Sequence, residues 1–142
     1  MKSIERHVGR VIVAKLFPDE DLVDAITEIV INHDINAGLV NVIGALKKCT
    51  LGFFNIETNE YQFKTFEENV ELISCMGNIA HVSTGPIIHL HVSLGRQDYS
   101  IIAGHLSQPS IISITGEVYI YEIDKKLKRA VDPQFGLSLL DL

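Results

Sequence analysis

The sequence predicts an α+β domain with a mainly antiparallel sheet, and two patterns carry this prediction. Near the N-terminus, apolar residues recur at the spacing of one amphipathic helix. After it, short apolar or alternating segments follow one another between polar, Gly or Pro breaks, as consecutive strands do. The 142 residues contain no internal repeat, low-complexity segment or linker, so we expect a single domain over residues 1–142.

The first predicted elements are a strand and the helix. The apolar run 11–14 indicates a strand that ends near Leu16, and Pro18 breaks it. The helix is expected over residues 19–33, with Asp19 as its cap and Asp21 near the positive end of its dipole. Its apolar face is expected to consist of Leu22, Ile26, Ile29 and Val30, with His33 at the same spacing.

The rest of the chain has the patterns of strands. Gly44 is expected to mark a bend or bulge, residues 57–60 a hairpin turn, and Gly85-Pro86 a further turn. The apolar end of the segment 124–142 is expected to pack on the core or on a neighbouring subunit. Strands are predicted at residues 39–43, 46–56, 61–66, 71–76, 79–82, 87–94, 100–106 and 111–122.

The charge of the chain argues against direct nucleic-acid binding. The formal net charge is −6, whereas proteins that bind nucleic acids usually carry a basic patch. The basic residues cluster at one place, which we interpret as a solvated connector: Lys125, Lys126, Lys128 and Arg129.

The sequence is typical of a cytoplasmic protein without a membrane segment. Glu5 and Arg6 interrupt the N-terminal region, and no apolar run approaches the length of a membrane span. Cys49 and Cys75 lack the spacing of a zinc finger and are expected to be buried, reduced thiols.

Three of the six histidines lie within seventeen residues and form a candidate metal site. His89 and His91 are two apart on a predicted strand, so their side chains point to the same face. The segment 95–99 is the expected turn to the next strand. If the hairpin centres on residue 97, His105 lies opposite His89, and if it centres on residue 98, His105 lies opposite His91. Both registers bring the three imidazoles together. A hairpin centred between residues 97 and 98 would instead turn His105 to the opposite face, unless a bulge returned it to the face of His89 and His91.

Three neutral imidazoles suit Zn²⁺, and also other divalent transition metals such as Cu, Fe or Ni. A zinc site with three protein ligands keeps a fourth position for water or substrate. A fourth protein ligand would have to come through folding or assembly, and the candidates are His81, Asn78 and Glu117.

These motifs resemble the plants-and-prokaryotes-conserved (PPC) domain over residues 9–123 or so. The resemblance rests on short segments at matching spacing: 9–13, 44–46, 77–79, His89-Leu90-His91-Val92 with Gly95, Gly104-His105-Leu106, and 117–118.

The resemblance implies a curved, mainly antiparallel sheet with one helix, a homotrimer, and a metal held by His89, His91 and His105. Plant members of the family carry an additional AT-hook for DNA. The present chain has no Arg-Gly-Arg-Pro hook, and Glu68 and Asn69 stand where the plant motif has glycine and arginine.

We consider three functions. The first is an oligomeric metal-binding module for a small ligand or a protein partner. The second is a zinc-dependent hydrolase or lyase, in which Glu117 or Glu71 would act as general base and Asn78 would orient the substrate. The third is a DNA-associated regulator that acts through a partner.

Overall fold

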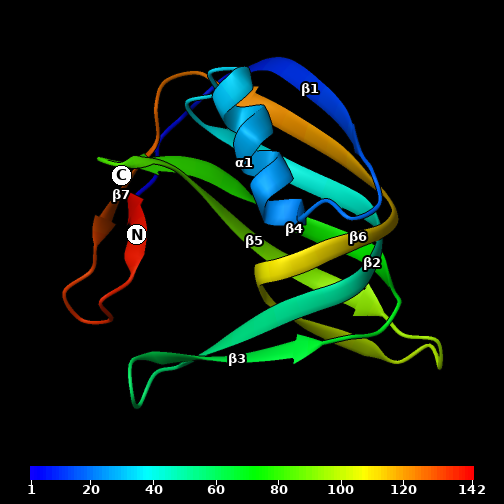
Figure 1. The fold of residues 1–142 in the computed structure, drawn as a ribbon. Coiled ribbons are helices and arrows are strands. Elements are labelled where there is room, and N and C mark those ends of the chain that lie inside the picture. Colours follow the sequence, from blue (N-terminus) through cyan, green and yellow to red (C-terminus); the bar gives the residue numbers. More distant parts are fainter.

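The computed structural model describes residues 1–142 as one curved, mainly antiparallel sheet with a single helix, as the sequence predicts. Figure 1 shows helix α1 lying across one face of the sheet, with the C-terminal hairpin at an edge. The elements are β1 (Val8–Leu16), α1 (Leu22–Asn32), β2 (Gly38–Asn55), β3 (Glu60–Phe66), β4 (Val70–Val82), β5 (Gly85–Gly95), β6 (Ile101–Ile123), β7 (Lys128–Val131) and β8 (Ser138–Asp141).

The curvature comes from two long strands that each pair with several neighbours. The first half of β2 lies between β4 and β6, whereas its second half lies between β3 and β6. Strand β5 joins β4 to the first part of β6, so β2, β4, β5 and β6 close into a ring of pairings. The register shifts at Gly44, which has a φ of +152°, so the predicted bulge is confirmed.

The core lies between the sheet and α1. Leu22, Ile26 and Val30 of the helix are fully buried against apolar side chains of the strands, as their spacing predicts. Cys49 and Cys75 are also fully buried and free, which confirms the expected thiols. Helix α1 is not long and apolar enough to cross a bilayer.

The start of the helix differs from the prediction. Asp21 is the N-cap, and its carboxylate accepts hydrogen bonds from the backbone amides of Val23 and Asp24. Asp19 instead has a left-handed backbone (φ 77°) in the preceding turn and pairs with Lys47. The apolar period is the same for either start, so only the cap geometry decides between the two aspartates.

Several strand boundaries also differ. The predicted strands 39–43 and 46–56 form one strand, β2, and the predicted strands 71–76 and 79–82 form one strand, β4. Gly85 and Pro86 belong to β5 rather than to a turn, because Gly85 pairs with Val82 and the chain reverses over the two residues between them. The predicted strands 100–106 and 111–122 form one strand, β6, because β6 pairs with β2 on both sides of residues 108–110, where the register shifts.

The face of the sheet opposite the core carries exposed apolar side chains. Directly paired residues lie on the same face, so these side chains share one surface of β1, β6, β2 and β4, with Asn41 and Asn78 among them. We call it the outer apolar face; its members are Val11, Val13, Leu39, Ile43, Met76, Tyr119 and Tyr121.

Candidate metal centre

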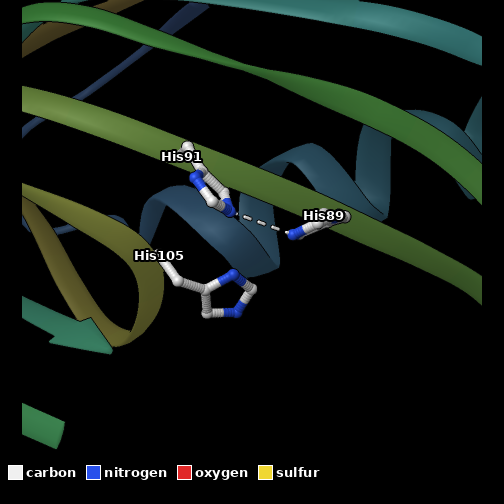
Figure 2. A group of neighbouring side chains, drawn as sticks. All are labelled: His89, His91 and His105. Carbon is white, nitrogen blue, oxygen red and sulfur yellow. Dashed lines mark hydrogen bonds between the residues drawn. The ribbon is translucent and has the colours of Figure 1, made fainter. Parts of the chain in front are cut away.

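The β5–β6 hairpin brings three imidazoles together. His91 pairs directly with His105, so the hairpin centres on residue 98, which is one of the two registers that the sequence allowed. His89 lies two residues before His91 on the same strand face. The candidate ligand atoms of the three rings all lie within 4.8 Å of one another. We call His89, His91 and His105 the histidine triad (Figure 2).

The donor atoms of the triad fit a metal ion. The Nε2 atoms of His89 and His91 are 3.2 Å apart, close to the roughly 3.3 Å between two nitrogens of a tetrahedral zinc site. The Nδ1 atom of His105 is buried and has no hydrogen-bond partner. Figure 2 shows the ring of His105 facing the other two rings. An orphaned imidazole nitrogen beside two others is the donor arrangement that a transition metal satisfies.

The surroundings keep the imidazoles in the form that binds metals. Burial lowers the pKa of His89 to about 4, and the nearby Arg129, His105 and His91 add to this effect. Burial also lowers the pKa of His105, with contributions from His91 and Arg129. At neutral pH these two rings are therefore uncharged, and a neutral ring nitrogen is what coordinates a metal.

Strand β4 pairs with β5 and fixes the position of the two histidines on it. Gly77 pairs with Leu90, which lies between His89 and His91, and the added Cβ of any other residue would overlap the carbonyl group of His89. Asn78 pairs directly with His89 and therefore lies on the triad's face of the sheet. Asn78, which the sequence suggested as a substrate-orienting residue or fourth ligand, thus lies beside the site. Its side-chain oxygen accepts a hydrogen bond from Arg129 at 2.6 Å.

Arg129 corrects the interpretation of the basic cluster as a solvated connector. It lies on β7, its Nη2 is 3.4 Å from Nδ1 of His89, and its Nη1 donates to the carbonyl oxygen of Ser138 at 2.8 Å. The strand explains the difference, because Leu127 is buried, Lys128 is exposed and Arg129 is half-buried. The alternation of Leu127 and Arg129 around an exposed lysine was the signal available in the sequence.

A cavity of about 310 Å³ opens at the triad. The C-terminal hairpin forms one wall, so the segment 124–142 packs against the sheet of its own chain. The ring of Tyr61, on β3, lies 5.1 Å from that of His105. The residues that line the cavity are Tyr61, Ile87, Ile88, the triad, Arg129, Leu137, Ser138 and Leu139.

The two acidic candidates lie elsewhere. Glu71 pairs with Gly95, at the far end of β5 from His89, and lines a different cavity. Glu117 pairs with Ile43 across β2 and β6. The structure therefore does not bring either carboxylate to the triad, because each is several residues removed along its strand from the pairs that contain the histidines. His81, the other proposed fourth ligand, instead contacts the carbonyl oxygen of Ile35 through its Nε2.

The fold and the site together define a class: a curved antiparallel sheet with a three-histidine candidate metal centre on one of its hairpins. Residues 3–124 match the model of the Plants and Prokaryotes Conserved (PCC) domain. The chain belongs to this family, as the resemblance seen in the sequence indicated.

Solved structures agree with this assignment. A metal-containing protein from Archaeoglobus fulgidus is 31% identical, with a TM-score of 0.91 and a match that covers all of both chains. A plant- and prokaryote-conserved protein from Pyrococcus horikoshii is 28% identical, with a TM-score of 0.91, over 100% of this chain and 98% of its own. A protein from Bacteroides thetaiotaomicron, provisionally described as DNA-binding, is 31% identical with a TM-score of 0.89 over 96% of each chain. No curated protein sequence matches the chain.

Proposed function

We propose that this protein is a metal-binding PCC domain whose triad holds one Zn²⁺ per chain and presents it to a small ligand or a protein partner. The observation that carries the proposal is the convergence of three imidazoles with one buried nitrogen unpartnered. When bound, the metal would supply Lewis acidity and an open coordination position at the cavity. His89, His91 and His105 are the proposed ligands, and the similar protein from A. fulgidus is described as containing a metal.

Metal content tests this proposal. We would measure zinc by mass spectrometry in the wild type, in His105→Ala and in His33→Ala, all purified without a histidine tag. His33 serves as the matched control because it lies at the end of α1, outside the triad. We expect about one zinc per chain in the wild type and the control, and a loss in His105→Ala. Full zinc content in His105→Ala would show that the ligands are assigned wrongly.

We also propose that the chain forms a homotrimer through the outer apolar face. Seven large apolar side chains are exposed there on adjacent strands, and contiguous apolar patches of this kind mark association surfaces. Tyr119 and Tyr121 lie near its centre, paired with β1 on one side and β2 on the other. Because Met76 pairs with His91, this surface is continuous with the triad.

Light scattering after size exclusion tests the assembly. We expect the wild type to have three times the 15.8 kDa mass of one chain. Tyr119→Lys should dissociate it, since the substitution places a charge in the apolar contact. Ile31→Lys is the control, because Ile31 is exposed and apolar but lies on α1. A monomeric wild type would contradict the proposal.

We propose no catalytic step, since no carboxylate lines the cavity and neither Glu71 nor Glu117 is available as a base there. We also expect no direct DNA binding, since the net charge is −6. A salt-dependent shift of duplex DNA at micromolar protein would contradict this second expectation. The buried, reduced thiols of Cys49 and Cys75 support a cytoplasmic location.

A further inference from the structure

Arg129 is a half-buried cation without an acidic partner. Its hydrogen bonds go to the neutral acceptors Asn78, Ser138 and His89, and its Nε is buried and unpaired. All four ion pairs of the protein involve other residues. Buried charges are normally paired, so an unpaired guanidinium that faces a cavity indicates that an anion from outside the chain binds there.

The charge of the whole site points the same way. No aspartate or glutamate lines the cavity, and the proposed ligands are imidazoles, which coordinate a metal in their neutral form and so do not offset its charge. A divalent ion on the triad together with Arg129 would place three positive charges around a space of about 310 Å³. Such a concentration of charge in a partly desolvated cavity strongly favours an anionic ligand.

The protons of His89 connect the metal to Arg129. A guanidinium can only donate, so Nδ1 of His89 accepts from Arg129 in the metal-free protein and Nε2 carries the ring proton toward His91. If Nε2 were to hold a metal, the ring proton would lie on Nδ1, which could then no longer accept. His89 and Arg129 would present two donors to the same space, and a metal-bound histidine usually directs this N–H to a carboxylate, a carbonyl or water.

Much of the remaining wall of the cavity is apolar, and this limits the kind of anion. Beside Tyr61 and Ser138, the cavity is lined by the aliphatic residues Ile87, Leu137 and Leu139. A fully hydrated inorganic anion would gain nothing from these side chains, whereas a short hydrocarbon body would bury apolar surface against them.

On these grounds we propose that Arg129 and the metal-loaded triad bind a small organic carboxylate, with the carboxylate at Arg129 and the hydrocarbon body against the aliphatic walls. This inference rests on the proposed function, because it requires metal on the triad.

The test is calorimetric titration of zinc-loaded and metal-free protein with propionate, propionamide and inorganic phosphate. We expect the zinc-loaded wild type to bind propionate more tightly than the metal-free form does, and more tightly than propionamide or phosphate. Arg129→Gln should retain about one zinc per chain but bind propionate on the order of tenfold to a hundredfold more weakly. Arg129→Lys should lose less, because it keeps the charge without the planar fork.

Lys128→Gln is the matched control, since it removes the same charge from the neighbouring, exposed position of β7. Its propionate affinity should equal that of the wild type. Zinc content, measured on the same samples, distinguishes a failure of the proposed metal binding from a failure of the proposed carboxylate site. A wild type without zinc refutes the proposed function. With zinc bound, equal propionate affinity in Arg129→Gln, or tighter binding of propionamide or phosphate, refutes the carboxylate site alone.

Discussion

Gly77→Ala should destabilise the protein and weaken metal binding, because Gly77 lies where β4 passes closest to the backbone of β5. Its pair, Leu90, is fully buried and is flanked by His89 and His91. A Cβ at position 77 would lie 2.8 Å from the carbonyl carbon of His89, nearer still to its oxygen, and 2.9 Å from Cδ2 of Leu90. Ordinary van der Waals contacts are 3.4–4 Å, so the two strands would have to separate.

The structure sets the size of the effect. A separation of more than about half an ångström weakens the ladder hydrogen bonds on both sides of Gly77, at a net cost of about 1 kcal/mol each. Overpacking against Leu90 adds roughly 1–3 kcal/mol. We therefore expect the free energy of unfolding to fall by about 3–5 kcal/mol, which corresponds to a decrease in Tm of roughly 9–15 °C for a chain of this size. The zinc affinity should fall as well, since the same displacement moves His89.

Urea denaturation of the metal-free variants, followed by circular dichroism, measures the stability separately from the metal. Zinc affinity is then measured by competition with a chelator. Gly9→Ala is the control, because its Cβ would meet the nearest backbone atom at 3.6 Å, an ordinary contact. Its free energy of unfolding should stay within about 0.5 kcal/mol of the wild type. If Gly77→Ala were as stable as Gly9→Ala, the close approach of β4 to β5 would be wrong.

Three further predictions concern the helix cap, the thiols and the metal-free triad. Asp21→Ala should lower the free energy of unfolding by about 1–2 kcal/mol, because Asp21 caps α1 and also accepts a hydrogen bond from a backbone amide of β6. Glu28→Ala, on the exposed face of α1, should change the free energy of unfolding little, and denaturation curves of the two variants test the difference. Burial raises the pKa of Cys49 to about 11 and that of Cys75 to about 12, so the native protein should lose stability as the pH rises from about 9 toward these values. For the same reason both thiols of the native protein should resist Ellman's reagent at pH 8, and rapid labelling would contradict their burial. Because the pKa of His89 is lowered to about 4, the neutral ring of His89 contributes to the stability of the metal-free protein above about pH 6.5, and this contribution is lost as the pH falls toward 4. A Tm of the metal-free protein that stays unchanged between pH 6.5 and 4 would contradict this prediction.

Much of the fold could be predicted because its signals are local. The apolar period of α1, the turn predicted at residues 57–60 and found at 56–59, and the bulge at Gly44 each depend on a few neighbouring residues. The boundaries that were wrong depend on pairing with distant strands. The sequence around residues 107–110 interrupts the pattern of a strand, but pairing with β2 before and after this interruption makes β6 a single element.

The same division applies to the site. The sequence determined that His89 and His91 share a face, because strand geometry requires it, and it limited His105 to two registers that both converge. Only the tertiary structure selected the register centred on residue 98 and left Glu71 and Glu117 away from the triad. It also brought Arg129 back from the C-terminal hairpin to His89, forty residues distant along the chain. Alternation along a strand is fixed by the backbone of each residue, whereas a contact between distant strands depends on how the whole sheet curves and pairs.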